Sequence, residues 1–277
     1  MNSGSPDIYQ IEVLEEDGPI ARFLERDPRW TAYALADLDQ PYRANATFIG
    51  ARRGGELASL VMLYRLPGFL PLMPFGDRTG IASILERYRP LPSSFFVILE
   101  PKLQELRGTH FDAPDLRKMV RMSVHAGELG PAPSTAVRRL EERDLPAIAE
   151  LYAHWGNTFF DRLALEHGVY YGAFDGPTLV SIAGTHVVSR RCSLAVIGGV
   201  FTHPEYRGRG LATATTGAVA QQLKGDGIEL LVLNVKAGNV PAIAAYRRLG
   251  FTPYREFLEG PATVRRERRT DAPPAAP

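Results

Sequence analysis

Hydrophobic and polar residues recur with two different periods along the chain, and these periods predict a mixture of strands and helices. Apolar residues alternate within residues 8–14, form a continuous run at 94–99, and recur at helical spacing within 79–88. Residues 68–75 have strand character, but their two prolines predict an irregular or edge strand, because proline donates no ladder hydrogen bond. The other elements expected in this half are one or two helices within 17–38, a hairpin at 45–64, a short helix at 101–108 and a strand at 116–124.

Glycine and proline cluster at residues 126–134, where the periodicity stops, and we place a linker there. The linker predicts one domain over residues 1–125 and a second over residues 135–262, in keeping with a length of 277 residues. Residues 263–277 are charged and then rich in proline and alanine, so we expect a disordered tail.

The second half repeats the order of elements of the first. We expect Asp144 to cap a helix and the pair Asp175-Gly176 to turn a hairpin. The elements expected here are strands at 135–140, 193–202, 229–235 and 251–257, helices after Asp144 and at 157–167, 211–223 and 239–249, and a hairpin at 170–174 and 179–189. The shared order predicts a duplicated fold of the α/β class, as a pattern rather than as sequence identity.

One stretch, GGVFTHPEYRGRGLA at residues 198–212, joins an apolar strand to a helix through a turn with two glycines. Such a turn exposes several backbone N–H groups at the positive end of the helix dipole. Arg207 and Arg209 add positive charge, so the turn is suited to bind a pyrophosphate. The alternative is a glycine-rich turn with solvated arginines, because short glycine patterns have a high false-positive rate.

Composition narrows the class of protein. Hydrophobic residues make up 45% and charged residues 23%, as in an ordinary soluble globular protein. The most apolar long window, residues 57–75, contains Arg65 and three prolines, so we expect no membrane span. Cys192 is the sole cysteine, which excludes an intrachain disulfide and a cysteine metal cluster and suggests a reducing, cytoplasmic location. Net charge is +1 and the basic run at 265–269 is short, so we expect no nucleic-acid partner.

Three pieces of the second half together resemble the GNAT superfamily of N-acetyltransferases. Residues 207–212, RGRGLA, fit that family's R/Q-x-x-G-x-G/A loop for the pyrophosphate of acetyl-CoA. The strand at 199–202, followed by Pro204 and Tyr206, fits the segment that precedes the loop. The helix that begins at Asn239 and ends before Gly250-Phe251 fits the family's second half-motif. The sequence around the loop is similar to that of the glycine N-acyltransferase-like branch. The first half of the chain resembles a degenerate copy of the same fold.

The resemblance implies a fold and a donor site. Each half would be a twisted mixed sheet flanked by helices, and the second half would bind acetyl-CoA. The edge of the strand at Val200, Phe201 and Thr202 would pair with the pantetheine. The pyrophosphate would be held by the loop and the first turn of the next helix, that is, by Arg207, Gly208, Arg209, Gly210, Leu211, Ala212 and Thr213. In the first half, the equivalent turn at residues 75–80 lacks this spacing and carries an acidic residue, so we expect that half to have lost the phosphate site.

Two residues of the helix at 239–249 have candidate roles. By resemblance, Tyr246 would be the general acid that protonates the departing coenzyme thiolate, and the alternative is a core tyrosine packed under the loop. Asn239 could bond the coenzyme or serve only as a helix N-cap.

A general base is not evident, because the strand at 193–202 carries no carboxylate. His186, on the preceding strand, is the best-placed substitute, with a core histidine as the alternative. Residues on or beside the two helices of the acceptor side are further candidates, with a surface position as the alternative. They are His154, Asp161 and Glu166. His203 and Cys192 are expected to be exposed and structural, respectively.

We therefore expect an enzyme that transfers acetyl from acetyl-CoA, without a metal, to the amine of a small molecule by direct attack. A non-catalytic acyl-CoA-binding or regulatory protein is the alternative, motivated by the missing carboxylate. Acceptor identity, acyl chain length and assembly, a homodimer included, stay open.

Overall fold

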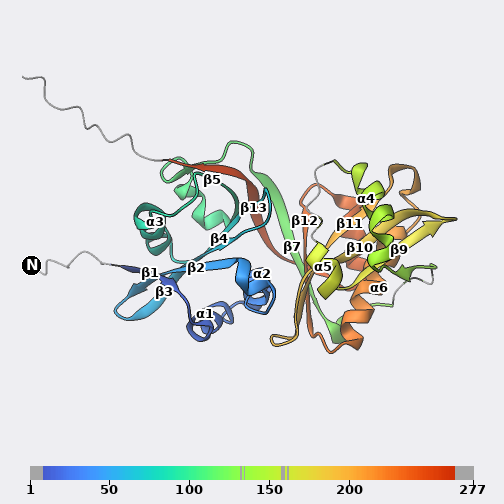
Figure 1. Ribbon diagram of the computed structural model, residues 1–277, viewed down its shortest axis with the longest axis horizontal. Helices are drawn as coiled ribbons and strands as arrows, with labels where there is room; N and C mark the ends of the chain where they lie inside the picture. The colour runs from blue at the N-terminus through green and yellow to red at the C-terminus, as the bar shows by residue number, and fades with distance from the viewer. Residues whose placement is uncertain (1–8, 132, 134, 157–159, 161, 266–277) are drawn as a thin grey trace, which may run out of the picture. The chain divides into compact units, whose positions relative to one another are not determined.

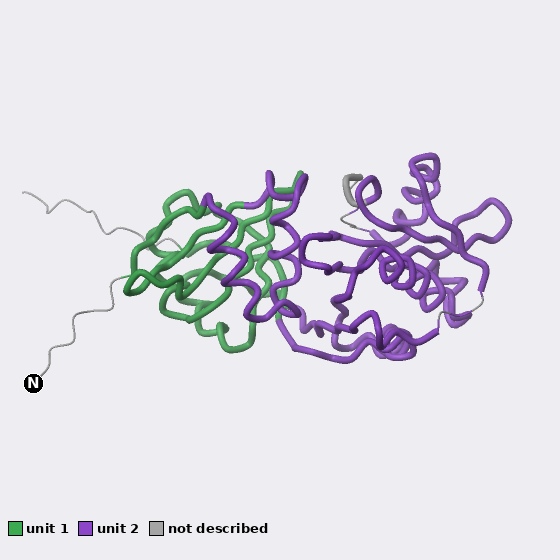
Figure 2. Tube along the Cα trace, turned by 90° about the horizontal axis from the view of Figure 1, so that it is seen from below, with its two compact units in different colours: residues 1–14, 47–116, 258–277 green, residues 15–46, 117–257 purple. Residues whose placement is uncertain are grey.

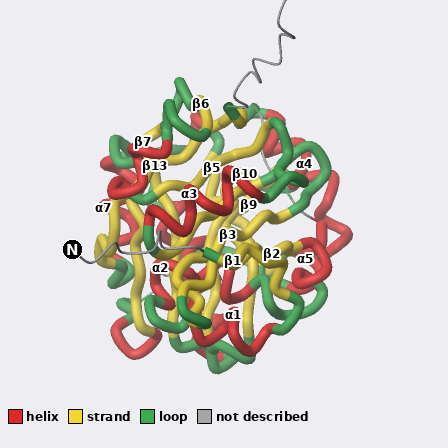
Figure 3. The backbone as a smooth tube through the Cα atoms, turned by 90° about the vertical axis from the view of Figure 1, so that its left-hand side faces the viewer, coloured by secondary structure: helices red, strands yellow, loops and turns green. Residues whose placement is uncertain are grey.

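The computed structural model describes residues 9–265, apart from 132, 134, 157–159 and 161. The chain forms two compact units that interleave in sequence (Figure 2). Unit 1 comprises residues 1–14, 47–116 and 258–277, and unit 2 comprises residues 15–46 and 117–257. Figure 3 distinguishes helices, strands and loops, and both units contain helices and strands.

Unit 1 is a sheet with the strand order β1-β2-β3-β4-β5-β13. Its strands are β1 (Gln10–Leu14), β2 (Ala46–Arg53), β3 (Glu56–Tyr64), β4 (Pro71–Gly76), β5 (Ser94–Leu99), the short β6 (Phe111–Asp112) and the second part of β13 (Thr252–Val264). The helix α3 (Arg78–Arg87) buries Ile81 and Ile84 in a hydrophobic cluster with strand residues such as Val61 and Val97. The 3₁₀ helix η2 (Pro101–Leu106) closes the same cluster with Leu103 and Leu106.

The expectation that residues 68–75 form an edge or irregular strand is wrong. β4 is buried and lies between β3 and β5. Pro74 is paired opposite Val61 of β3, but the parallel pairing with β5 covers only Pro71 and Leu72. The ladder on the β5 side therefore needs no N–H from Pro74, which is why an inner strand tolerates that proline.

Unit 2 is built around a mixed sheet with the strand order β7-β12-β11-β10-β9-β8 (Figure 1). The strands are β7 (Arg117–His125), β8 (Arg138–Arg139), β9 (Tyr170–Asp175), β10 (Thr178–Ser189), β11 (Leu194–Thr202) and β12 (Leu230–Lys236). β11 and β12 are parallel, and the other pairs are antiparallel. A parallel pair needs a crossover connection, which here is the helix α6 (Leu211–Gly225).

The two faces of this sheet have different helices. Val219 and Leu223 of α6 and Tyr246 of α7 (Val240–Arg248) pack in one hydrophobic cluster with Ile197 and Leu233. Helices α4 (Leu145–Ala153) and α5 (Arg162–His167) pack against β10. Side chains alternate along a strand, so Ile182, which packs against α4, faces away from Ala183 in the α6 cluster. The sheet is thus covered on both faces.

Two helices from early in the chain belong to unit 2. They are α1 (Asp17–Leu24) and α2 (Pro28–Ala36), followed by the 3₁₀ helix η1 (Tyr42–Asn45). α2 packs against β10, β11 and β12. It lies on the face opposite α6, because it contacts Arg121, whose neighbours Val120 and Met122 point into the α6 cluster.

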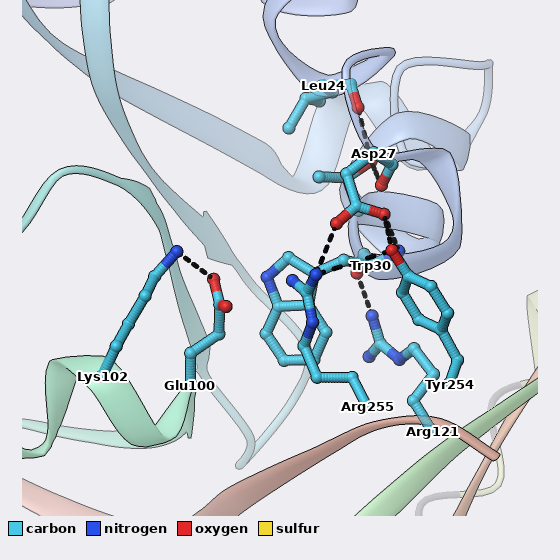
Figure 4. A network of polar contacts seen from close by, with 9 residues as sticks. Leu24, Asp27, Trp30, Glu100, Lys102, Arg121, Tyr254 and Arg255 are labelled. Atoms are coloured by element: carbon cyan, nitrogen blue, oxygen red, sulfur yellow. Dashed lines mark hydrogen bonds and ion pairs between the residues drawn. The ribbon is translucent and has the colours of Figure 1, made fainter.

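A cluster of polar and aromatic contacts holds the start of α2 (Figure 4). Asp27 accepts hydrogen bonds from Tyr254 Oη at 2.6 Å and from an Arg255 Nη at 2.8 Å, and it also caps α2 through the N–H of Trp30. The fully buried Arg121 donates to the carbonyl of Trp30, and its guanidinium lies 4.4 Å from the centre of the Trp30 ring. We call these five residues the α2 anchor.

The α/β fold with a mixed sheet is confirmed, whereas the sequential division at residues 126–134 stays a prediction. The compact units follow contacts rather than sequence order, because α1 and α2 pack with unit 2 and the end of β13 packs with unit 1. Thr263 and Val264 were placed in the tail, but they pair with Asp112 and Phe111. The rest of the proposed tail, residues 266–277, lies outside the described residues.

The structure describes only part of the helix expected at 157–167, and it shows a different role for Asp144. Of the helix expected at 157–167, the structure describes α5 from residue 162, and residues 157–159 and 161 lie outside the described part. Asp144 stands at the N-cap position of α4, but its carboxylate makes no cap bond there. It accepts instead from two nitrogens of Arg138 and from the N–H of Glu141, and these bonds lower its pKa.

Among the described residues, no helix is long and apolar enough to cross a membrane.

Asp37, at the end of α2, has a buried carboxyl group whose ionisation couples the stability of the fold to pH. Its side chain is buried, and burial raises its pKa well above the usual value. In the unfolded chain the same carboxyl ionises near pH ~4. The folded state therefore retains the proton to higher pH, and ionisation of Asp37 lowers the free energy of unfolding as pH rises above that point.

We predict that Asp37→Asn removes this loss. Thermal unfolding at pH 5 and pH 8 should show the variant gaining stability relative to the wild type at the higher pH. A difference in Tm between the two proteins that is the same at both pH values would contradict the account.

Candidate functional site

The site is defined by the place where two parallel strands separate. β11 pairs with β12 from Leu194↔Leu230 to Ile197↔Leu233, and no further pairing between them exists among the described residues. Both strands continue, β11 to Thr202 and β12 to Lys236. The edge of β11 that faces β12 therefore lacks a strand partner over residues 198–202, so it can accept an extended ligand by β-augmentation.

Glycines shape β11 at this point. Gly199 has a φ of +60°, and the pairing with β10 shifts register across residues 198–201. Tyr152 of α4 donates a hydrogen bond of 2.6 Å to the carbonyl of Gly199. A Cβ at Gly199 would stand 2.6 Å from that hydroxyl oxygen, so a side chain would displace the bond. The bulge thus depends on glycine for its backbone angle and for the close approach of Tyr152.

The loop between β11 and α6 has the form of an anion site. After the 3₁₀ helix η5 (Pro204–Tyr206), Gly208 and Gly210 both have a φ of +78°. A Cβ added at either glycine would meet nothing within 4 Å, so the concave side of the loop is open. Gly210 is the N-cap of α6 and has no side chain to bond the first N–H groups of the helix. Those groups are aligned with the helix dipole and available to an anion.

The two arginines of the loop are exposed and braced by backbone carbonyls. Arg207 Nε donates to the carbonyl of Thr202 at 3.2 Å, and Arg209 donates to that of Glu205 at 3.2 Å. The Arg209 guanidinium lies 4.8 Å from the centre of the Tyr206 ring, and Tyr206 in turn donates to Asp175 at 2.6 Å. These contacts hold the charges beside the loop, where they can form charge-assisted hydrogen bonds with phosphate oxygens.

The helix α7 adds the two other predicted residues. Asn239 is its N-cap, and the side-chain oxygen accepts from the N–H of Ala242 at 3.3 Å, so the capping role is confirmed. Tyr246 is 6% exposed and packs edge-on against Phe251, with ring centres 6.3 Å apart. It belongs to the hydrophobic cluster against which Val200 packs. Val200 of β11 and Tyr246 of α7 therefore lie on the same face of the sheet as α6.

The hydroxyl of Tyr246 has properties that suit a proton donor. Burial raises its pKa to about 12, so it stays protonated at neutral pH. Within the described part of the chain it makes no hydrogen bond that would hold the proton elsewhere. A thiolate of pKa about 8.5 would take this proton uphill in water. The same desolvation also raises the pKa of a thiol bound beside it, which narrows the difference.

Aromatic side chains gather on the α4 side of β11. Phe201 stacks on Trp155 with ring centres 5.1 Å apart, and Tyr152 packs beside both. Trp155 is 45% exposed, and His154 lies edge-on to His203 at 4.5 Å. His203 is thus partly covered rather than exposed as expected.

Within the described ranges, the structure gives no contact between the remaining candidate site residues and the diverging strands. Glu166 is exposed on α5, and Asp161 lies outside the described residues. Cys192 is half-buried and free, and its N–H donates to Ser189 Oγ. Nothing places these groups at the diverging strands.

The equivalent turn of unit 1 is filled by its own side chain. Asp77 caps α3 by accepting from the N–H of Gly80 at 2.8 Å, and it also accepts from Tyr9 and Ser59. A carboxylate at this helix start would repel a phosphate, which agrees with the expected loss of the anion site in that half.

A cavity of about 590 Å³ in unit 2 is lined by Asp39, Tyr42, His167 and Arg190, among others. It also includes Val188, which pairs with Ala195 near the start of β11, away from the diverging end. This position separates it from the predicted donor site. The described residues contain no group of three or more side chains arranged to hold a metal ion.

The comparisons with known proteins agree with this geometry. Residues 135–251 match the model of the Acetyltransferase (GNAT) family. This part of the chain is therefore similar to the acetyltransferases of the GNAT family.

Curated relatives match shorter stretches. A mycothiol acetyltransferase from Pseudarthrobacter chlorophenolicus is 32% identical over 117 residues, which are 41% of this chain and 35% of that protein. One from Corynebacterium glutamicum is 39% identical over 72 residues, 26% of this chain and 25% of that protein. The chain thus spans about a third or less of the length of these relatives.

Solved structures resemble nearly the whole chain. A GCN5-related N-acetyltransferase from Sphaerobacter thermophilus has a TM-score of 0.61 at 18% identity and covers 94% of this chain and 96% of its own. A tandem GNAT protein from the clavulanic acid biosynthesis pathway has a TM-score of 0.58 at 14% identity and covers 93% and 98%. At these identities the likeness shows the fold alone.

Proposed function

We propose that the protein is an acyl-CoA-dependent N-acyltransferase that moves acetyl from acetyl-CoA to the amine of a small molecule by direct attack. The observation that carries this proposal is the joining of an open anion loop to the unpaired edge of β11. A long ligand with a pyrophosphate at one end and amides in its middle matches both features. The family match of residues 135–251 supports the same donor.

The donor would lie along β11. N–H groups from Gly208 to Thr213 and the guanidinium groups of Arg207 and Arg209 would bind the pyrophosphate. The pantetheine amides would pair with the edge of β11 from Val200 to Thr202 as an added strand. Asn239 uses its oxygen for the helix cap, which leaves its amide N–H groups for a coenzyme contact.

The chemistry needs charge stabilisation and a proton donor. A backbone N–H near Val200 could stabilise the oxyanion that forms on the thioester carbonyl, a contribution of about 3 kcal/mol. Tyr246 would protonate the departing thiolate. Leu211 and Ala212 would contribute through their backbone at the start of α6, since each sits in its first turn.

We also propose that residues 135–262 are the acetyl-CoA-binding domain, of the glycine N-acyltransferase-like branch, and that residues 1–125 are a degenerate GNAT-like copy. The tandem GNAT neighbour, which covers 93% of this chain, and the Asp77 cap in place of an anion site support the second part. The acceptor would be a small-molecule amine.

The first test is coenzyme binding. Acetyl-CoA should raise the Tm of the wild type by binding only the folded state. Gly210→Glu should abolish that shift, because it places a carboxylate where the pyrophosphate would lie. Gly210→Asn places an uncharged side chain at the same position, where asparagine tolerates a positive φ better than other residues, and Gly225→Glu adds the same charge at the far end of α6. An unchanged Tm for the wild type at saturating acetyl-CoA would refute the proposed function.

The second test addresses Tyr246. Tyr246→Phe keeps the packing against Phe251 but removes the proton donor. We expect kcat to fall by about 100-fold with an unchanged shift in Tm on acetyl-CoA binding. Tyr171→Phe, which removes a partly buried hydroxyl bonded to Gln222, is the matched control. A wild-type rate in Tyr246→Phe would exclude the acid role.

The alternative is a non-catalytic acyl-CoA-binding or regulatory protein, because β11 carries no carboxylate base. Acetyl transfer to any amine in a panel of aminosugars, amino acids and polyamines would exclude it. Donor binding without transfer to any of these amines would favour it.

A further inference from the structure

β11 carries no carboxylate that could serve as the general base, but its partner strand β10 carries a histidine, His186. β10 pairs with β11 as Gly184↔Gly198 and Thr185↔Ile197, and then as Val187↔Val196. Between the last two pairs β10 advances by two residues and β11 by one. His186 is therefore the extra residue of a bulge in β10. Bulges re-aim a side chain, and this one lies next to the register shift at Gly199.

The bulge directs the imidazole onto the point where β11 leaves β12. A Cβ added at Gly198 would overlap the ring of His186, so the ring lies directly against that glycine. Gly198 is the first residue of β11 beyond the last pair with β12. His186 is half-buried while both its strand neighbours are buried, and β11 is also partly exposed at residues 198–200. The imidazole is thus partly accessible at the point where β11 leaves β12.

The imidazole lies on the face of the sheet opposite α6. His186 packs against Tyr33 of α2, with ring centres 6.0 Å apart. Tyr33 also lies 5.4 Å from the Arg121 guanidinium, and Arg121 donates to Asn234 Oδ1 at 2.9 Å. Asn234 belongs to β12 just beyond its last pair with β11. His186 and Asn234 therefore both lie on the α2 face, next to the point where β11 and β12 stop pairing.

The α2 anchor fixes this arrangement. Asp27 is bound by Tyr254 and Arg255, so α2 is held at its start, and Tyr33 follows one turn after Trp30 on the same helix. A segment from the first half of the chain thus contacts the imidazole in the second half. α6 lies on the opposite face.

We propose that His186 is the general base that accepts the proton of the acceptor amine, and that Tyr33 positions its ring. This inference rests on the proposed acetyl transfer. The amine would attack the thioester carbon from the α2 face, beside His186. As the N–C bond forms, one proton of the nitrogen passes to the imidazole, directly or through one water. The C–S bond then breaks, and the thiolate takes its proton from Tyr246. The imidazolium returns its proton through solvent to the tyrosinate, so acetyl and one proton exchange places and both residues are restored.

This assignment accounts for a strand without a carboxylate. The base comes from β10 rather than β11, and glycine at position 198 leaves room for the ring. A general base contributes on the order of 100-fold or more to the rate, so its removal is measurable.

The test uses the full-length protein, acetyl-CoA and glucosamine, or the panel amine with the highest rate, with thiol release as the readout. His186→Ala and His186→Gln should both lower kcat by about 100-fold, while the Tm shift on acetyl-CoA binding is retained. Glutamine fills the space and makes hydrogen bonds but cannot accept the proton. Gly198→Ala should lower kcat as well, because the added methyl displaces the ring.

The outcomes separate the two proposals. If the wild type transfers acetyl and His186→Gln is as fast as the wild type, His186 is not the base, and the proposed function stands. If Tyr33→Phe has the wild-type rate and Tyr33→Ala is slow, the packing role of Tyr33 is supported, and a wild-type rate in Tyr33→Ala overturns it. If the wild type binds acetyl-CoA but transfers to no amine, the enzyme proposal fails, and the base falls with it.

Discussion

The separation of β11 from β12 after Ile197 and Leu233 is the constraint on which the rest of the site depends. A parallel pair that stayed closed would use the backbone groups of residues 198–202 in its own ladder. Because the strands part, that edge is left for an extended ligand, and the loop that follows faces open solvent at Gly208 and Gly210. The glycines at 198 and 199 make the separation compatible with close packing by His186 and Tyr152.

The opposite face depends on an element from elsewhere in the chain. α2 is held against unit 2 by Asp27, Trp30 and Arg121, and it brings Tyr33 to His186. A fully buried arginine is costly unless its donors are bonded and its charge is compensated. Here the aromatic rings of Trp30 and Tyr33 and the oxygens of Asn234 and the Trp30 backbone supply part of that compensation. The donor side is thus local in sequence, whereas the acceptor side is assembled over long range.

That difference explains what could be predicted from the sequence. The anion loop at 207–213, the Asn239 cap and the order of elements are set by glycine geometry, capping and hydrophobic period, all of which are local. The approach of α2 and the pairing of Thr263 with Asp112 depend on partners far away in the chain, and the bulge at His186 depends on the register of β10 with β11. The carboxylate of Asp144 makes no cap bond to α4, because it binds Arg138 instead. The prolines of β4 predict an edge strand, but β4 lies inside the sheet. The extent of its pairing with β5 decides whether a backbone N–H is needed, and the local sequence does not show that extent.

The most direct measurement is a crystal structure of the protein with bound coenzyme A. The account predicts the pyrophosphate within hydrogen-bond distance of the N–H groups of residues 208–213, the pantetheine paired with Val200–Thr202, and the sulfur beside the hydroxyl of Tyr246. Coenzyme bound elsewhere, such as in the cavity beside Asp39 and Arg190, or bound with its sulfur remote from Tyr246, would contradict it.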